Sequence, residues 1–274
     1  MFKEMTKPLI MGILNVTPDS FSDGGKYTDI ESAIEQVRLM LSEGVDIIDI
    51  GGESTRPGSE SVTENEQILR VVPVIEAIRS NFPDTLLISI DTTLSGVAKA
   101  ALDAGANIIN DVSAGQGDKH ILSVASDYEV PIILMHMQGT PQTMQDNPYY
   151  DDVVSEICEL LQQRVNEALA AGIKKENIVL DPGIGFGKRT QDNINLLAQL
   201  ERFVALGYPV LLGTSRKRFM GSLCSVSEPA ELVTATAVTT ALGVMTGVQM
   251  FRVHDVKENR QAADVAWAIK HAKC

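Results

Sequence analysis

The amino-acid sequence predicts an α/β fold of the (β/α)8, or TIM-barrel, class with eight parallel strands. Eight short apolar runs, each typical of a buried strand, alternate with segments of helical periodicity. Strict alternation requires parallel strands, because each crossover between parallel strands is then a helix. The 274 residues suit a barrel of roughly 250 residues. The expected strands lie within residues 8–16, 45–52, 86–92, 107–114, 131–137, 177–183, 208–215 and 248–255.

Helical patterns fill the gaps between these runs. The first covers 29–42, and Thr63 with Glu66 resembles a capping box that opens a helix through Arg79. A doubly wound open sheet is the alternative fold, but eight units with no element left over favour a closed barrel in a single domain over 1–274. Further helices are expected over 95–105, 118–128, 149–172, 191–206, 229–246 and 257–272.

Two loops that follow predicted strands are unusually long, at residues 16–28 and 52–63. Both are rich in Gly, Pro, Ser and Thr, a composition typical of exposed, flexible loops. The reaction centre of a barrel lies at the carboxyl ends of its strands, where these loops begin. We therefore expect both loops to act as lids over a site.

Composition and charge limit the possible partners and location. A net charge of −13 argues against nucleic-acid binding, which needs a basic face. The three cysteines lack metal-ligand spacing and cannot all pair, so a reducing cytoplasm is expected, and the N-terminal residues lack a signal-peptide pattern. The apolar segment 232–251 is long enough to be considered as a membrane span. Its threonines and glycines favour a buried helix followed by a strand, so no membrane partner is expected.

Polar residues stand at the ends of the apolar runs, where a barrel places its chemistry. Asp91, Asn110 and Asp181 end the third, fourth and sixth runs, and together they suit a flat heterocycle with several N–H groups. A hard-cation site is the competing interpretation, and loop capping is a third. The other polar residues at or just beyond strand ends are Asn15, Glu53, Asp111, His136, Ser215, Arg252 and His254.

Two further motifs have alternative interpretations. Residues 181–188 (DPGIGFGK) fail the phosphate-loop pattern because Pro182 and Arg189 occupy required positions, so a glycine-rich turn is favoured over a phosphate cradle. Residues 213–219 (GTSRKRF) carry three consecutive cations, which favour either a solvated turn or an anion site after strand seven. His136 receives no role from these patterns.

Taken together, these motifs resemble the dihydropteroate synthase family of the folate pathway, over nearly the whole chain. The first two blocks and the SRK block are the most specific. The matching blocks are ILNVTPDSFSDGG (13–25), DIGGESTRPG (49–58), SIDT (89–92), INDVSAG (109–115), LMHMQGTPQTMQ (134–145), LDPGIGFGK (180–188), GTSRKRFMG (213–221) and RVHDV (252–256).

The resemblance implies a barrel enzyme that joins 4-aminobenzoate to dihydropterin-6-ylmethyl diphosphate, releasing diphosphate and 7,8-dihydropteroate. It implies Mg²⁺ as cofactor with Asn15 as its ligand, and Asp181, Lys217, Arg56 and Asp23 as catalytic residues. The implied pterin contacts are Asp91, Asn110, Asp181, Lys217, Arg252 and Met135; the diphosphate contacts are Asn15, Thr55, Arg56, Arg252 and His254; the aminobenzoate contacts are Phe21, Thr55, Pro57, Phe186, Ser215 and Lys217.

The implied chemistry is a dissociative substitution, because an aromatic amine is a weak nucleophile and needs a strongly electrophilic carbon. Three rival functions are a pterin-dependent methyltransferase, a pterin-binding paralogue without catalysis, and a phosphate-binding isomerase or aldolase. The STRPG loop and the SRK motif argue against the first. The residues Asn15, Arg56 and Lys217 argue against the second, and no strand ends in a Schiff-base lysine for the third.

The segment 229–246 is apolar on most sides and rich in small residues, whereas a surface helix should show a polar face. Tight packing under neighbouring segments and a subunit interface are both open interpretations. The resemblance implies a homodimer formed through helices in this part of the barrel. It also implies a sulfonamide target, because Phe21 and the STRPG loop look like a susceptible aminobenzoate site.

Overall fold

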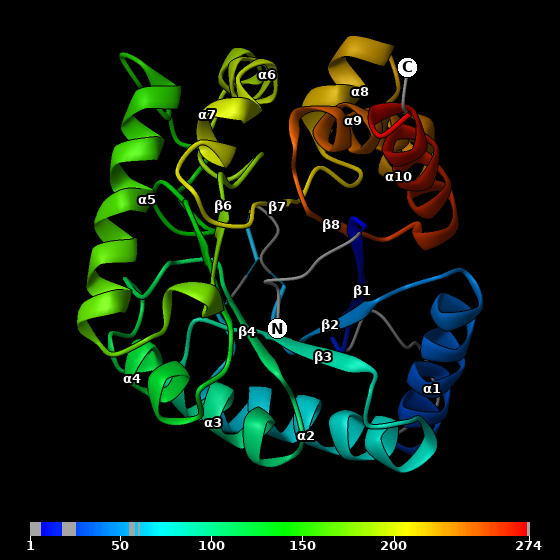
Figure 1. Cartoon of the computed structure of the whole chain (residues 1–274). Helices are drawn as coiled ribbons and strands as arrows, with labels where there is room; N and C mark the ends of the chain where they lie inside the picture. The colour runs from blue at the N-terminus through cyan, green and yellow to red at the C-terminus, as the bar shows by residue number, and fades with distance from the viewer. Residues whose placement is uncertain (1–6, 18–25, 55–57, 60, 273–274) are drawn as a thin grey trace.

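A computed structural model of the chain describes residues 7–17, 26–54, 58–59 and 61–272. Eight parallel strands form one sheet in the order β6-β5-β4-β3-β2-β1-β8-β7. A parallel bridge between Leu180 and Val210 joins the two edges, so the sheet closes and the predicted barrel is confirmed. Figure 1 shows the helices outside the strands. The strands are β1 (Leu9–Asn15), β2 (Ile47–Gly51), β3 (Leu87–Asp91), β4 (Ile108–Asp111), β5 (Ile132–Met135), β6 (Ile178–Asp181), β7 (Leu211–Leu212) and β8 (Met250–Val253).

The helices occupy the predicted gaps, with three differences. The segment 191–206 breaks at Gln199, whose backbone leaves the helical region, into α6 and α7. A 3-10 turn, η4 (Pro229–Glu231), precedes α9, and a short helix, α8, follows β7 where only a loop was expected. The helices are α1 (Lys26–Ser42), α2 (Glu64–Asn81), α3 (Ser95–Asp103), α4 (His120–Asp127), α5 (Val153–Ala170), α6 (Thr190–Ala198), α7 (Leu200–Val204), α8 (Arg218–Cys224), α9 (Val233–Thr246) and α10 (Val256–Lys270), with the 3-10 turn η3 (Lys175–Asn177) before β6.

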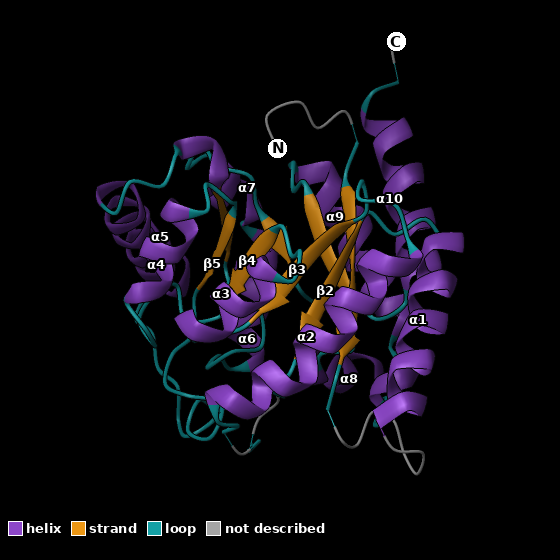
Figure 2. Cartoon of the chain, turned by 90° about the horizontal axis from the view of Figure 1, so that it is seen from below, coloured by secondary structure: helices purple, strands orange, loops and turns teal. Residues whose placement is uncertain are grey.

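Two separate apolar cores flank the strands. The larger one lies between the strands and the helices, and the smaller one fills the inside of the barrel. Figure 2 shows the strands from another side, enclosed by helices. The inner core comprises Met11, Ile47, Ile108, Ile133, Val179, Leu211 and Met250, with Leu9 and Leu87 packed against it.

Alternation along the strands places a polar layer directly above this inner core. Successive side chains point to opposite faces, so the residue two positions beyond an inner-core residue also points into the barrel. Ile47 is followed in this way by Asp49, and Val179 by Asp181. Asn110 Nδ2 on β4 donates to Asp49 Oδ2 on β2 at 3.2 Å, although these strands are not neighbours. The polar side chains therefore meet across the barrel interior, at the carboxyl ends of the strands.

The segment 232–251 forms α9 and β8, as its composition predicted. Within the ranges that the structure describes, no helix is long and apolar enough to cross a membrane.

Candidate active site

A cavity of about 740 Å³ opens at the carboxyl ends of the strands. Residues from β1, β4, β6 and β8 and from the loops after β6 and β7 surround it. The structure thus brings together most of the polar residues that the sequence placed at strand ends. The predicted contacts that line the cavity are Asn15, Asn110, Met135, Asp181, Phe186, Ser215, Lys217, Arg252 and His254.

The remaining predicted contacts have different positions. Asp91 is joined to the cavity through Arg252, with which it forms an ion pair at 2.6 Å. Glu53 accepts a hydrogen bond from Gln67 Nε2 at 2.6 Å, so it supports the start of the second long loop. The predicted residues Phe21, Asp23, Thr55, Arg56 and Pro57 lie outside the described residues.

Arg252 forms the centre of an ionic network below the cavity. Its Nε donates to Asp49 Oδ2 and its Nη2 to Asp91 Oδ2, both at 2.6 Å. Burial raises the pKa of Asp91 to about 7; Arg252 opposes this rise, and the nearby Asp49 and Asp111 add to it. Burial lowers the pKa of Arg252, but Asp49 and Asp91 outweigh it and raise that pKa overall. Arg252 therefore stays charged, with its guanidinium held between two carboxylates.

Asp49 is the site residue that the sequence analysis missed. It is fully buried, and its Oδ2 accepts from both Arg252 and Asn110. Because a carboxylate oxygen can only accept, the amide nitrogen of Asn110 faces Asp49 and its oxygen faces away. Asp49 Oδ1 and the adjacent Ser89 Oγ make no hydrogen bond to the residues described. The sequence does contain a signal for Asp49. It stands two positions after Ile47 in an apolar run, and this spacing points its side chain into the barrel.

Asp181 ends β6 with its carboxylate buried beside three cations. Its Oδ1 accepts from the backbone N–H of Gly183 at 2.7 Å, which leaves Oδ2 to accept from a ligand. Burial raises the pKa of Asp181 to about 6, and the Gly183 N–H together with Lys217, Lys188 and Arg252 limits the rise. This group is therefore an acceptor at neutral pH and loses that capacity in mild acid.

The cations of the SRK motif divide between two environments. Arg216 has a positive φ of 57° and pairs with Asp255, with Nε 3.0 Å from Oδ2. Lys217 Nζ instead lies 4.0 Å from the centre of the Phe186 ring, at the edge of the cavity. Burial and Arg252 lower the pKa of Lys217 to about 8, against the pull of Asp181 and Asp91. Arg216, Lys217 and Arg218 all line the cavity, although Asp255 engages the first of them, and the anion site at this motif stays a prediction.

The loop after β7 also meets β8 at the cavity edge. Ser215 Oγ lies 2.9 Å from His254 Nδ1 and accepts from the His254 backbone N–H at 3.1 Å. This pair fixes the two residues side by side. A small apolar group of Val112, Met135, Met144 and Phe186 lines another part of the same cavity. The cavity thus combines a polar interior with an apolar wall, which suits a flat heterocycle that carries N–H groups.

The chain is similar to known proteins over nearly its whole length. The family model described as pterin binding enzyme matches residues 11–254. A dihydropteroate synthase from Streptococcus pyogenes serotype M3 is 49% identical over 257 residues, covering 93% of each chain. The structure of the Clostridium difficile dihydropteroate synthase in the presence of pteroic acid has a TM-score of 0.93 and 44% identity, covering 99% of this chain and 100% of that one. The Xanthomonas albilineans enzyme with 4-aminobenzoic acid has a TM-score of 0.91 and 43% identity, covering 98% and 95%.

The fold and the site define an α/β-barrel enzyme that binds a flat, polar heterocycle at the carboxyl ends of its strands. The family model and the relatives cover nearly the whole chain at high identity. The chain belongs to the pterin-binding enzymes and, within them, to the dihydropteroate synthases, which transfer a pterinylmethyl group. The resemblance found in the sequence is therefore confirmed.

Proposed function

We propose that this chain condenses dihydropterin-6-ylmethyl diphosphate with 4-aminobenzoate by a dissociative route, with the polar layer of the barrel holding the pterin. The observation that carries the proposal is the buried layer in which Asp181, Asn110 and the Arg252 network face one cavity. The pteroic acid and 4-aminobenzoic acid named with the two solved relatives support the same pair of ligand classes. Both substrates are small molecules, and neither a nucleic acid nor a membrane is needed as a partner.

In this proposal the pterin is held by acceptors that match its N–H groups. Asp181 Oδ2 and the outward-facing amide oxygen of Asn110 accept hydrogen bonds from the ring. Asp91 also accepts one when Arg252 moves away from it toward the ligand. Met135, in the apolar wall, packs against the ring face. Charged acceptors make stronger hydrogen bonds than neutral ones. The two aspartates also stabilise positive charge that develops on the ring as the carbon–oxygen bond breaks.

The diphosphate is placed near Asn15, Arg252 and His254, which line the same cavity. Arg252 neutralises charge on the departing oxygen. Thr55 and Arg56, outside the described residues, are assigned to the same group, and Asp23 is assigned to orienting the amine or the cation. The two long loops exclude water, which would otherwise capture the carbocation as an alcohol.

The residues present fit a magnesium ion at this position. Asn15 lines the cavity together with Arg252 and His254, and its amide oxygen is a ligand of the kind that Mg²⁺ accepts. Mg²⁺ takes one or two protein oxygens and completes its shell with water and substrate phosphate. The described residues contain no group of three or more His, Cys, Asp or Glu suited to a metal. We therefore propose a magnesium site completed by water and substrate, not one built from protein ligands alone. When bound, the ion would neutralise charge on the diphosphate.

The aminobenzoate is assigned to the outer part of the cavity. Phe186, Ser215 and Lys217 supply its described walls, and Phe21, Thr55 and Pro57 complete it from outside the described residues. The Lys217 ammonium lies over the Phe186 ring and is attracted by Asp181, so in this proposal it contacts both substrates. We assign sulfonamides to the same site.

The test is diphosphate release by the purified chain with the pterin diphosphate and Mg²⁺, measured with and without 4-aminobenzoate. We expect pteroate and stoichiometric diphosphate only with both substrates, and loss of release when a chelator removes the metal. Adding Mg²⁺ back should restore the rate. Release at the same rate without 4-aminobenzoate would show that water, not the amine, is the acceptor and would contradict the proposal.

We also propose that the chain is a homodimer that uses α9. Val238, Leu242 and Met245 are 54%, 59% and 46% exposed, and their spacing places them on one helical face. An apolar stripe of this kind is typical of an interface. Cys158 and Cys224 are free thiols, which agrees with a proposed cytoplasmic location.

The double substitution Val238→Lys with Leu242→Lys should convert the dimer to a monomer in sedimentation velocity at micromolar concentration, because it buries two charges in the interface. Leu69→Lys is the matched control: Leu69 is 66% exposed on α2, and its replacement should leave the dimer intact. A wild-type chain that sediments as a monomer would refute the dimer.

A further inference from the structure

The glycine-rich loop between β6 and α6 encloses the buried amino group of Lys188. Burial lowers the pKa of this group to about 7, and the carbonyl oxygens around it favour the protonated form. Lys188 is only 3% exposed, and its Nζ donates to the carbonyl oxygens of Gly183 at 2.7 Å and Phe186 at 2.9 Å. The same atom lies 2.9 Å from His136 Nδ1. The His136 carbonyl oxygen lies farther away, at 3.4 Å, so the three protons of an ammonium have at least as many acceptors as they need.

The loop has the polarity of a cation site, opposite to that of a phosphate loop. Phosphate loops turn backbone N–H groups toward the ligand, whereas this loop turns carbonyl groups toward Lys188. Gly183, Gly185 and Gly187 all have positive φ, at 68°, 84° and 64°. A Cβ at Gly183 would lie 1.8 Å from the His136 carbonyl oxygen, so only glycine permits this path. The preference for a glycine-rich turn over a phosphate cradle is confirmed.

His136 gains a defined role in this arrangement. Its Nδ1 faces an ammonium and must therefore be the unprotonated, accepting nitrogen of a neutral ring. Burial first, and then the charge of Lys188, lowers the pKa of His136 to about 2. The backbone N–H of His136 donates to the Asp181 carbonyl at 3.0 Å, which ties β5 to β6 beside the loop. The ring is held where it can accept from Lys188.

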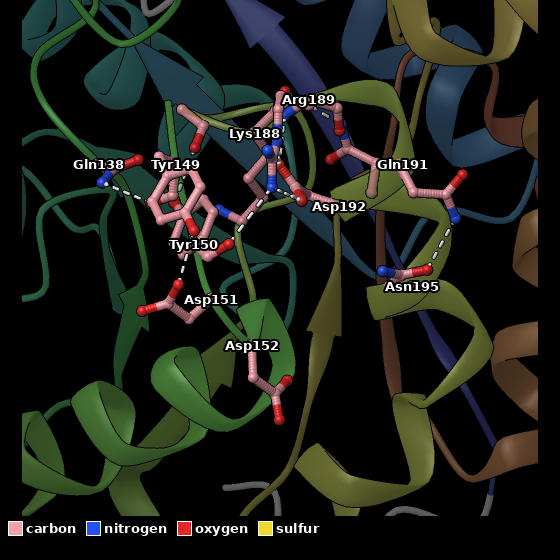
Figure 3. A network of polar contacts seen from close by, with 12 residues as sticks. Gln138, Tyr149, Tyr150, Asp151, Asp152, Lys188, Arg189, Gln191, Asp192 and Asn195 are labelled. Atoms are coloured by element: carbon pink, nitrogen blue, oxygen red, sulfur yellow. Dashed lines mark hydrogen bonds and ion pairs between the residues drawn. The ribbon is translucent and has the colours of Figure 1, made fainter. Parts of the chain in front are cut away.

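A second set of contacts holds the loop from outside. Tyr150 Oη donates to the Gly187 carbonyl at 2.7 Å. Arg189 caps α6 through Asp192, and its guanidinium lies 5.5 Å from the Tyr149 ring. Figure 3 shows Lys188 beside this network, with the two tyrosines on one side and Asp192 on the other. These contacts anchor the end of the loop that leads into α6, next to Lys188.

We propose that Lys188, held by His136, is a positioning residue that shapes the loop so that the Phe186 ring forms the aminobenzoate wall beside Lys217. The Phe186 carbonyl is bound by Lys188, while its ring lies 4.0 Å from Lys217 Nζ. Loss of the ammonium releases that carbonyl and therefore displaces the ring. This inference rests on the proposed function, because the aminobenzoate site is part of it.

The test compares Lys188→Met, which keeps an apolar stem without the ammonium, with two substitutions of His136. His136→Leu removes the acceptor, whereas His136→Asn places an amide oxygen close to the position of Nδ1. We expect Lys188→Met and His136→Leu to raise the KM for 4-aminobenzoate at least about tenfold, because small displacements of a binding wall have large effects. His136→Asn should restore a KM near the wild-type value. The affinity for the pterin diphosphate, measured by calorimetry without 4-aminobenzoate, should change by less than about threefold.

Hydrogen exchange provides a readout that does not depend on turnover. The amides of residues 183–188 should exchange faster in Lys188→Met and His136→Leu than in the wild type and His136→Asn. Lys175→Met, which changes a lysine at the opposite end of the barrel, should alter neither measurement. Unchanged exchange and unchanged KM would overturn the proposal, and so would equal losses of pterin and aminobenzoate binding. A wild-type chain that binds both substrates but makes no pteroate would instead refute the proposed function.

Discussion

Asp181→Asn is expected to lower kcat/KM for the pterin diphosphate by at least about 100-fold. A hydrogen bond to a charged group is worth about 1.5–3 kcal/mol, and each 1.4 kcal/mol is roughly tenfold. The Gly183 N–H holds Oδ1 as an acceptor, so the asparagine amide nitrogen would take the place of Oδ2. A donor would then face the N–H groups of the pterin. The charge that stabilises the developing cation is lost in the same change.

The measurement is steady-state kinetics in the coupled diphosphate assay, with pterin affinity determined separately. Asp84→Asn is the matched control, because Asp84 is exposed in the segment between α2 and β3, at the amino ends of the strands and away from the cavity. Burial raises the pKa of Asp181 to about 6, and the acceptor form is the deprotonated one. Wild-type kcat/KM should therefore fall as the pH is lowered through about 6. A near-normal rate for Asp181→Asn would remove this residue from the site.

Lys217→Ala is expected to lower kcat/KM by on the order of 100- to 1,000-fold, the usual cost of removing one preorganised donor from a reaction centre. The ammonium lies over the Phe186 ring and is attracted by the buried Asp181 and Asp91, so its loss affects both substrate positions. It also leaves Asp181 and Asp91 with one cation fewer. The apparent affinity for 4-aminobenzoate should fall together with kcat.

Lys175→Ala is the matched control for this change. Its ammonium also lies over an aromatic ring, 5.0 Å from the centre of Tyr208, but at the amino-terminal end of β6. Turnover should be unchanged in that variant. Burial lowers the pKa of Lys217 to about 8, and the charged form is present below that value. Wild-type activity should therefore decline as the pH rises through about 8. If Lys217→Ala retained full kcat/KM, the cation would have no part in catalysis.

Much of the fold follows from local pattern. Each apolar run forms a strand because its residues can be buried on both faces, and each helix covers the strand before it. The boundaries were less predictable. The break at Gln199 and the short helix Arg218–Cys224 were not predicted, because the local periodicity marks neither of them.

The candidate site divides in the same way. Asn110 and Asp181 were predictable, because a polar residue that ends an apolar strand points into the barrel by alternation. Asp49 obeys the same rule but stands in the middle of its run, so it was not among the residues predicted at strand ends. Its importance comes from Arg252, which lies 203 residues away in the sequence and 2.6 Å away in space.

The sequence by itself determined the barrel, the family and most of the polar residues around the cavity, because strand ends and motifs are local features. Only the tertiary structure decided which partner each charge has. Arg216 pairs with Asp255, Lys217 lies beside Phe186, and Lys188 turns inward to His136. The physical reason is that a buried charge requires partners, and closing the barrel brings together partners that are far apart along the chain.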